Sequence, residues 1–392
     1  MSAIANASGS VQPIELLVWQ DFDAKRFLEQ CWQRHPLLIR SWLQPETMAM
    51  EQMADAAADE ELASRLVTGE FEKLDWKLEY GPFAGDELPR LDQPYQSLLV
   101  QDMDKKHAQV ARLFDAFQFL PNWLLDDIMI SQAGPGGSVG PHVDAYDVFL
   151  VQASGQRRWE LAGQYQPDLN EDFELAVLRN FKCEASCVVE PGDVLYIPAG
   201  IAHHGIAQQI CQTWSVGLRA PSSAELLAEL AGYLGEQPSR QPRLNPEQYD
   251  PDRAERIDQK MLQQTRRIMT QALQLSDQEL MLWLGRALTA YRQWNPEVAF
   301  DPDEEPSDLE LPLVFLPGTR LAWSESGQLF VNGEDLPCPS DFALQLCREG
   351  RLDEWPPDPT ALALIEHLIE QGELVSKSSL EVFERRPDDE AQ

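Results

Sequence analysis

The chain has 392 residues, 43% of them hydrophobic, which is enough length for two or three domains with sizeable buried cores. Its 65 acidic residues outnumber 31 Lys and Arg residues, and the formal net charge is −34. Because a polyanion is bound by Lys and Arg, this charge opposes direct binding to nucleic acid.

The sequence also shows neither the pattern of a targeting signal nor a CxxC pair of cysteines. Residues 1–12 lack the basic start and apolar run of a signal peptide, and no later window of about eighteen uncharged apolar residues is found. We therefore expect neither export nor a membrane span. The six cysteines form no CxxC pair, which indicates neither a disulfide framework nor a zinc ribbon and favours the reducing cytoplasm.

The first part of the chain predicts a mixture of helices and strands. Residues 23–34 have apolar side chains at helical spacing, and residues 35–40 follow as a short strand. Residues 48–66, rich in alanine and acids, predict one or two helices. Residues 70–80 alternate as a strand.

A second group of elements precedes a glycine-rich loop. Residues 97–103 predict a strand, residues 106–117 a helix, and residues 126–132 another strand. The loop at residues 134–137 has no GxGxxG spacing and no helix after it. A phosphate-binding loop is therefore not indicated.

Residues 139–161 read as a hairpin with two polar side chains at its start. His142 and Asp144 are two residues apart, so on a strand both side chains leave the same face. Residues 146–152 are apolar and rich in β-forming residues, residues 153–155 indicate a turn, and residues 157–161 begin the return strand.

A histidine that could join this pair comes later in the chain. Residues 189–204 predict a strand, a Pro-Gly turn, a second strand and another turn, and they end at His203 and His204. Two histidines and one carboxylate can then meet. Such a group leaves adjacent positions open on iron(II) for a co-substrate and dioxygen. A lone His-x-Asp is more often a hydrogen-bonded polar pair than a metal site. The prediction of a metal site therefore depends on the later histidine motif.

These motifs, in this order, resemble the JmjC group of 2-oxoglutarate oxygenases, which are built on a double-stranded β-helix. Residues 140–159, 190–205 and 214–221 are similar to the bacterial ribosomal oxygenases, arginine hydroxylases that act on ribosomal large-subunit protein sixteen. The likeness is strong from about residue 90 to 220 and looser in the flanks. It implies Fe(II) as cofactor, with 2-oxoglutarate and dioxygen as co-substrates.

The resemblance also implies roles for single residues. Its Pro-x-Gly-x-x-His pattern selects His203 as the metal ligand beside His142 and Asp144, and His204 would face outward or support the shell of the site. In its Gly-x-(Lys/Arg)-x-Trp context, Arg157 would bind the far carboxylate of 2-oxoglutarate. The neighbouring Arg158 has the opposite strand parity and is the second choice.

The substrate implied by the resemblance is an arginine side chain of a basic ribosomal protein, hydroxylated at its β-carbon. An acidic chain would attract such a protein, although an acidic surface can equally serve solubility alone. Asp127, Tyr146 and Asp147, with Asp126, lie on or next to the inner strands. They are the candidates for contact with the guanidinium.

Beyond residue 221 the hydrophobic period becomes helical. Ser222-x-x-Glu225 and Ser276-x-x-Glu279 are capping boxes, and residues 252–273 predict a helix between them. Such modules are more often intramolecular bundles, but the resemblance implies a dimerisation region. An acidic, Pro-rich linker at 296–310 precedes strands and helices in a winged-helix order. These are acidic and lack a basic recognition helix, so protein packing is favoured over DNA binding.

We therefore expect an α+β protein with a double-stranded β-helix (cupin/JmjC) core, a helical dimerisation module and a C-terminal winged-helix domain. The expected ranges are 1–220 for the catalytic domain, with its core at about 90–220, then 221–296 and 297–392. The expected function is that of a cytoplasmic, homodimeric iron(II)- and 2-oxoglutarate-dependent arginine hydroxylase. Two alternatives stay open: a non-redox cupin-type metal enzyme or binding module, in which Arg157 has no task, and a regulatory adaptor.

Overall fold

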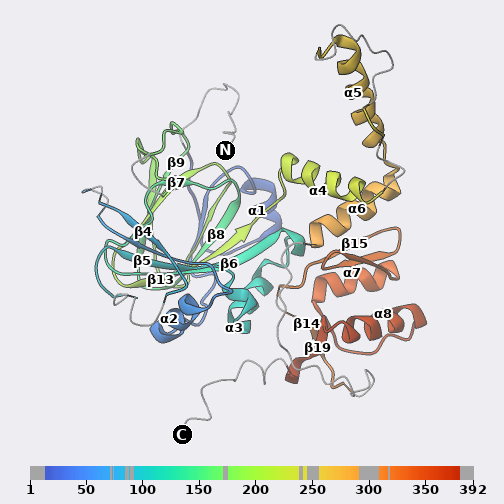
Figure 1. The fold of residues 1–392 in the computed structure, drawn as a ribbon. Coiled ribbons are helices and arrows are strands. Elements are labelled where there is room, and N and C mark those ends of the chain that lie inside the picture. The colour runs from blue at the N-terminus through green and yellow to red at the C-terminus, as the bar shows by residue number, and fades with distance from the viewer. Residues whose placement is uncertain are drawn as a thin grey trace. The chain divides into compact units, whose positions relative to one another are not determined.

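The computed structural model describes residues 14–379, except 71–72, 74, 84–87, 89–91, 171–174, 238–241, 245–255, 291–308 and 317. The chain forms two compact units, Met1–Ala220 and Pro221–Gln392 (Figure 1). The boundary expected near residue 296, and the acidic linker up to residue 308, lie outside the described residues. None of the described helices combines the length and apolar character needed to cross a membrane.

The first unit contains two sheets that face each other. The larger has nine strands in the order β1-β2-β11-β8-β13-β6-β5-β3-β4, and the smaller has four in the order β10-β9-β12-β7. All pairs are antiparallel except β1–β2. The strands are β1 (Leu17–Trp19), β2 (Leu37–Ile39), β3 (Ser64–Thr68), β4 (Lys77–Tyr80), β5 (Gln96–Val100), β6 (Leu125–Ala133), β7 (His142–Val143), β8 (Asp147–Ser154), β9 (Arg157–Ala162), β10 (Ala185–Val189), β11 (Val194–Ile197), β12 (Ala202–Ala207) and β13 (Cys211–Leu218).

The larger sheet is covered on both faces, which explains the long apolar runs in its central strands. On β8, Phe149 and Val151 face a core shared with the N-terminal helices, whereas Val148 and Leu150 face the smaller sheet. Strand β13 is buried along its whole length. Alternate residues of these strands therefore serve either the outer core or the space between the sheets.

Three helical segments cover the outer face of the larger sheet. They are α1 (Ala24–Gln30), α2 (Met50–Ala58) and α3 (Ala108–Ala111), and the last continues as a 3-10 helix over Arg112–Phe117. The carboxylate of Asp23 caps α1 by accepting from the Arg26 amide at 2.6 Å. Phe27 of α1 is fully buried against Phe149 of the sheet.

Two sequence expectations fail in this region. The helix expected over residues 48–66 ends at Ala58, because Ser64–Thr68 forms β3 and pairs with both β4 and β5. The strand expected over residues 70–80 begins only at Lys77. The first difference depends on pairing with β5, a contact that local periodicity does not record.

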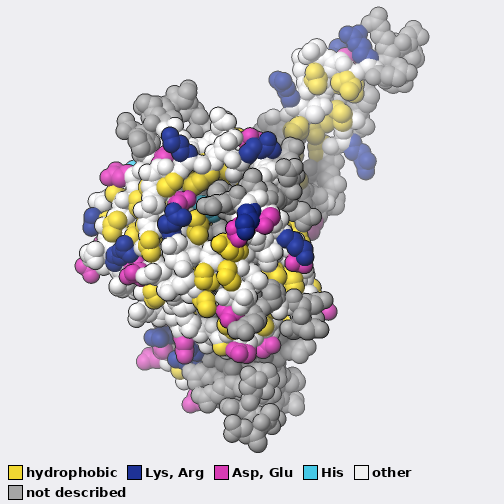
Figure 2. Space-filling model, turned by 90° about the vertical axis from the view of Figure 1, so that its left-hand side faces the viewer, with side chains coloured by type: hydrophobic (Ala, Val, Ile, Leu, Met, Phe, Trp, Pro, Cys, Tyr) yellow, Lys and Arg dark blue, Asp and Glu magenta, His cyan; other side chains and the backbone are white. Residues whose placement is uncertain are grey.

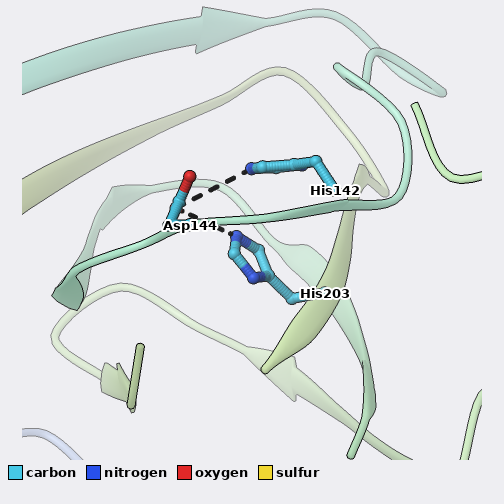
Figure 3. A group of neighbouring side chains, drawn as sticks. All are labelled: His142, Asp144 and His203. Atoms are coloured by element: carbon cyan, nitrogen blue, oxygen red, sulfur yellow. Dashed lines mark ion pairs between the residues drawn. The ribbon is translucent and has the colours of Figure 1, made fainter. Parts of the chain in front are cut away.

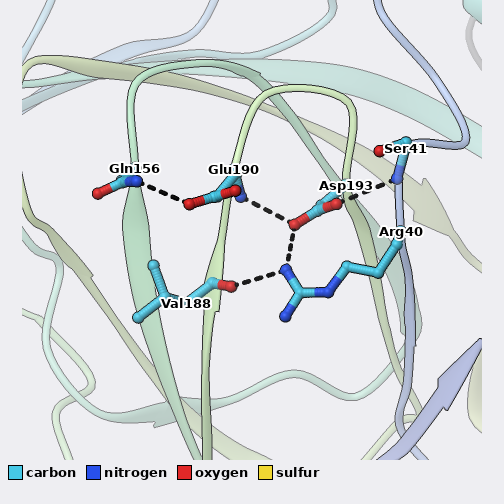
Figure 4. A network of polar contacts seen from close by, with 6 residues as sticks. All are labelled: Arg40, Ser41, Gln156, Val188, Glu190 and Asp193. Atoms are coloured by element: carbon cyan, nitrogen blue, oxygen red, sulfur yellow. Dashed lines mark hydrogen bonds and ion pairs between the residues drawn. The ribbon is translucent and has the colours of Figure 1, made fainter.

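The Pro-Gly-Asp turn between β10 and β11 is fastened to the N-terminal segment through Asp193 (Figure 4). This side chain is only 3% exposed. Its carboxylate accepts from the backbone amides of Ser41 at 3.1 Å and Glu190 at 3.0 Å, and it pairs with the guanidinium of Arg40. One buried carboxylate therefore joins the end of β2 to the smaller sheet.

We predict that Asp193→Ala lowers the free energy of unfolding by on the order of 3 kcal/mol, because three donors lose their acceptor. Urea unfolding of the full chain measures this effect. The control is Asp21→Ala, which removes an exposed carboxylate that forms no hydrogen bond or ion pair with the described residues. Equal effects of the two substitutions would contradict the assignment.

The second unit contains helices first and small sheets afterwards. Its elements are α4 (Ser223–Gly235), α5 (Gln259–Ala272), α6 (Asp277–Thr289), β14 (Leu313–Phe315), β15 (Leu321–Ser324), β16 (Gln328–Val331), β17 (Glu334–Pro337), α7 (Ser340–Glu349), β18 (Arg351–Leu352), α8 (Pro359–Glu370) and β19 (Leu374–Ser376). Capping boxes open α4 and α6 as expected. The strands form the sheets β18-β14-β19 and β15-β16-β17.

The helices of this unit differ in how far they are packed. Helices α4 and α6 share a small core around Trp283, and Gly285 of α6 lies against the ring of Phe330 on β16. By contrast, α5 has no buried residue. The helix expected over residues 252–273 begins only at Gln259, because residues 256–258 are not helical; residues 252–255 lie outside the described residues.

Candidate metal centre and reaction cavity

His142, Asp144 and His203 meet between the two sheets (Figure 3). The antiparallel pairing of β7 with β12 sets His142 directly opposite His203, and Asp144 follows β7. An oxygen of Asp144 lies 3.9 Å from Nε2 of His142 and 3.5 Å from Nε2 of His203. One ligand atom from each residue falls within 4.8 Å of the others. In the described part of the chain, no other group of this kind is found.

Both imidazole rings are oriented by main-chain carbonyls. Nδ1 of His142 lies 2.8 Å from the oxygen of Gly140, and Nδ1 of His203 lies 3.0 Å from the oxygen of Ile201. When Nδ1–H donates to these carbonyls, Nε2 carries the lone pair and faces Asp144. Two imidazoles and one carboxylate arranged in this way fit iron(II).

The electrostatics of the site also keep a ligand nitrogen available. Burial, reinforced by the neighbouring His142, lowers the pKa of His203 to about 4, although Asp144 acts in the opposite direction. The His203 ring is therefore neutral at neutral pH. A neutral imidazole is the form that binds a metal.

His204 lies on the other face of β12 and is buried, being 1% exposed. The alternative in which it faces outward is wrong, because this face is covered as well. Its Nδ1 lies 3.6 Å from a carboxylate oxygen of Glu160, which also pairs with Arg158. Burial lowers the pKa of His204 to about 3. His204 and Arg158 thus belong to one polar cluster behind the metal ligands.

Arg157 is on the same face of the smaller sheet as His203. The β9–β12 register pairs Arg157 with Ala207, Trp159 with Gly205 and Leu161 with His203, so these alternate positions share a face. Arg157 is 6% exposed, and its Nε and Nη2 have no hydrogen-bond partner among the described residues. A buried, unpaired guanidinium is costly unless an anion binds it, so this position fits a carboxylate ligand.

A cavity of about 230 Å³ extends from the triad and from Arg157 along the larger sheet. Asp127 and Tyr146 line it, as expected. Asp147 is not among the lining residues, because it begins β8 on the opposite face and accepts a hydrogen bond from the Tyr196 hydroxyl instead. The next residue, Val148, faces the cavity. Asp126, which precedes Asp127 on β6, faces the other side of the strand and does not line the cavity either.

The carboxylate of Asp127 is held in place by main-chain groups. One of its oxygens accepts from the Asp102 amide at 3.3 Å. A Cβ at Gly217 would lie 3.1 Å from the other oxygen, so the glycine provides the space that the carboxylate needs. Burial, with the charges of Asp144 and Asp127, raises the pKa of Tyr146. Its hydroxyl therefore stays protonated and can donate a hydrogen bond.

Several lining residues were not identified from the sequence. They come from strands that contribute alternate residues to the floor of the cavity: Arg65, Ser97, Met129, Ser131 and Ser215. Strand parity could have found them only with the order β13-β6-β5-β3 in hand. That order is a non-local property of the fold.

The facing sheets and the two-histidine, one-carboxylate group are typical of a JmjC oxygenase, and residues 112–226 match the family model of the JmjC domain. The chain is 31% identical over 385 residues to the ribosomal protein uL16 3-hydroxylase of Escherichia coli (strain K12), covering 91% of this chain and 97% of that protein. It is 33% identical over 333 residues to a probable ribosomal oxygenase of Haemophilus influenzae, covering 79% and 80% of the two chains.

A solved structure of the Escherichia coli ribosomal oxygenase YcfD in complex with cobalt and 2-oxoglutarate is also similar. Its TM-score is 0.74 at 29% identity, covering 91% of this chain and 98% of that one. A YcfD complex with cobalt and succinic acid gives a TM-score of 0.73. The chain therefore belongs to the bacterial JmjC ribosomal oxygenases, a family of 2-oxoglutarate-dependent enzymes with a cupin fold. The resemblance seen in the sequence motifs is confirmed.

We predict that His142→Ala, Asp144→Ala and His203→Ala each weaken Fe(II) or Mn(II) binding by more than about 100-fold, because each removes a ligand. Isothermal titration of the metal into the folded protein measures this. His204→Ala should change metal affinity by less than about tenfold, since its ring faces the Glu160 cluster. Equal losses at His203 and His204 would contradict the assignment.

Proposed function

We propose that this protein is an iron(II)- and 2-oxoglutarate-dependent hydroxylase that modifies the β-carbon of an arginine side chain in ribosomal large-subunit protein sixteen, uL16. The main support is the identity of 31% over almost the full length of a uL16 3-hydroxylase. The cobalt and 2-oxoglutarate bound by YcfD agree with the donor set found here. A non-redox cupin would leave the buried guanidinium of Arg157 without a task.

The proposed roles follow from the geometry of the cavity. His142, Asp144 and His203 would hold the metal, and the main-chain carbonyls described above fix the two imidazole rings. When bound, iron(II) with 2-oxoglutarate and dioxygen supplies the oxidising chemistry that adds one oxygen atom to a C–H bond, with succinate and carbon dioxide as co-products. Arg157 would bind the far carboxylate of 2-oxoglutarate and so orient it.

The substrate arginine would enter along the floor of the larger sheet. Asp127 is the acceptor for its guanidinium, since its carboxylate lines the cavity and is held from behind by the Asp102 amide. Tyr146, protonated and partly exposed at the cavity, would donate to an acceptor on the substrate. These contacts would hold the arginine with its β-carbon turned toward the metal ligands.

The overall charge suits a basic protein substrate. The net charge of −34 attracts cationic proteins and repels nucleic acid. On the face drawn in Figure 2, acidic side chains are interspersed with Lys and Arg. The attraction therefore depends on net charge rather than on a single patch of that face. A substrate that belongs to the ribosome also supports a cytoplasmic location.

We further propose that residues 221–296 form a dimerisation region and that α5 contributes to it. The helix has no buried residue, and Leu262, Met269 and Leu273 are each at least 45% exposed. Burying this apolar stripe against a second copy of the chain would remove it from water.

Sedimentation velocity of the full chain tests the dimer. We expect dimers for the wild type and a shift toward monomers for Met269→Glu, because a carboxylate would be buried in the interface. Gln271→Glu on the same helix adds the same charge at a non-apolar position and is the control. A monomeric wild type would contradict the proposal.

Residues 297–392 would act as a winged-helix domain that packs on protein. Helix α8 contains no Lys or Arg, and α7 contains only Arg348. Neither helix has the cationic character of a DNA-reading helix, which supports protein contact over nucleic-acid binding.

Mass spectrometry of uL16 tests the enzymatic proposal. We predict that a uL16 peptide gains one oxygen atom on an arginine side chain when it is incubated with the protein, iron(II), 2-oxoglutarate and air. Omitting any of these components should abolish the gain. Oxygen found only on a histidine, or loss of a methyl group from a lysine, would contradict the choice of arginine.

We predict that Arg157→Ala raises the apparent KM for 2-oxoglutarate by roughly 30- to 700-fold, equivalent to about 2–4 kcal/mol for a charge-assisted, two-point contact. Because Nε and Nη2 of the guanidinium have no hydrogen-bond partner among the described residues, the substitution should not lower the melting temperature. The control is Arg158→Ala, which alters the next residue on the opposite face. A larger effect at Arg158 would reverse the two roles.

A further inference from the structure

A second arginine lines the same cavity without a role in the proposed chemistry. Arg65 lies on β3, where it pairs with Leu99 of β5, and both side chains face the cavity. Its guanidinium reaches across β5, because Nη2 lies 3.8 Å from the sulfur of Met129 on β6. The charged end of Arg65 is therefore directed along the cavity floor toward Asp127, which is two residues from Met129 on the same strand face.

The hydrogen bonding of this guanidinium is incomplete. The sulfur of Met129 is its one hydrogen-bond acceptor in the described residues, and a thioether is a weak acceptor. Its Nε is buried and has no partner there, and none of the described carboxylates forms an ion pair with it. A partly buried cation with unused donors indicates an acceptor that comes from outside the chain.

A neighbouring hydroxyl shows the same deficit. Ser97 of β5 is 2% exposed and lines the cavity, and its Oγ has no partner among the described residues. The β3–β5 register pairs Ser97 with Val67, so Ser97 and Arg65 are diagonal neighbours on one sheet face. The β5–β6 register places Ser97 beside Ala133, which packs with Ala207, the cross-strand partner of Arg157. The Arg65 guanidinium reaches Met129 in the opposite direction, so the Ser97 hydroxyl lies on the Arg157 side of the cavity, away from the Arg65 donors.

The co-substrate does not explain the unused donors of Arg65. Of the two carboxylates of 2-oxoglutarate, one would lie at the metal and the other on Arg157, which belongs to the smaller sheet. Arg65 is on the larger sheet, one strand from its edge at β4. An acceptor at Arg65 must therefore belong to a different molecule.

We propose that Arg65 forms a subsite that binds an oxygen acceptor of the substrate polypeptide, a main-chain carbonyl or a carboxylate, beside the residue that reacts. This inference rests on the proposed function. Asp127 and Met129 are separated by about 6.6–6.8 Å along β6, comparable with the reach of one extended arginine side chain. On the cavity floor, the carboxylate of Asp127 can thus bind the guanidinium of the substrate arginine. The guanidinium of Arg65 can bind a main-chain carbonyl or a neighbouring acidic residue of the substrate.

The test compares Arg65→Gln with the wild type, and the probe is a uL16 peptide containing the unmodified arginine that the enzyme would hydroxylate. Peptide affinity is measured by fluorescence anisotropy on the Mn(II)-loaded protein, and KM values are measured for peptide and 2-oxoglutarate. We expect a 10- to 100-fold loss of peptide affinity for Arg65→Gln. The KM for 2-oxoglutarate should stay within twofold.

Arg26→Gln is the matched control, because Arg26 is an exposed residue of α1, on the outer side of the larger sheet. It should leave peptide affinity unchanged. Peptides in which each acidic residue is replaced by its amide separate the two sources of the acceptor. If wild type and Arg65→Gln bind one of these peptides with equal affinity, the acceptor is the carboxylate that this peptide lacks. If every peptide still distinguishes them, the acceptor is a main-chain carbonyl.

Two results would overturn the subsite while leaving the proposed function intact. One is a wild-type enzyme that hydroxylates the peptide while Arg65→Gln binds it within twofold of the wild type. The other is an increase in the KM for 2-oxoglutarate that matches the loss of peptide affinity, which would assign Arg65 to the co-substrate. A wild-type enzyme that hydroxylates no uL16 arginine would overturn the proposed function and, with it, the subsite.

Discussion

The antiparallel pairing of β7 with β12 is the constraint on which the candidate site depends. It sets His142 opposite His203 at a fixed separation, and the further pairing of β12 with β9 places Arg157 on the same face. Because side chains alternate across a strand, a slip of one residue in either pairing would turn an entire set of side chains away from the cavity. The register of a four-stranded sheet thus determines the position of both histidine ligands and one guanidinium.

The cavity concentrates polar groups that the protein alone does not satisfy. Arg65, Ser97 and Arg157 all carry buried donors without partners in the described residues. Most buried polar groups in proteins are paired, so these residues and Trp159, whose indole Nε1 is also buried without a partner in the described residues, form an unusual group around one cavity. In a packed core they would lower stability. Around a cavity that opens to ligands, they instead favour the bound state over the free one.

Local chemistry was readable from the sequence, whereas long-range pairing was not. The spacing of His142 and Asp144 and the later His203 predicted a set that the structure brings together, and strand parity separated Arg157 from Arg158. Parity says only that neighbouring residues face opposite ways, and not which way is inward. The cavity position expected for Asp147 failed for that reason, and β3 was predicted as helix because its partner β5 lies far along the chain.

The orientation of the two histidines has a consequence for how the site can vary. Their Nδ1 acceptors are the carbonyls of Gly140 and Ile201, which every amino acid possesses. Substitution of neighbouring side chains therefore cannot delete these acceptors and can only move the backbone that carries them. At Gly140 that backbone has a φ of +80°, and a Cβ there would lie 1.9 Å from the indole ring of Trp76. Variation in metal affinity among such sequences would thus arise through loop shape, with Trp76 and Gly140 changing together, rather than through exchange of hydrogen-bonding side chains.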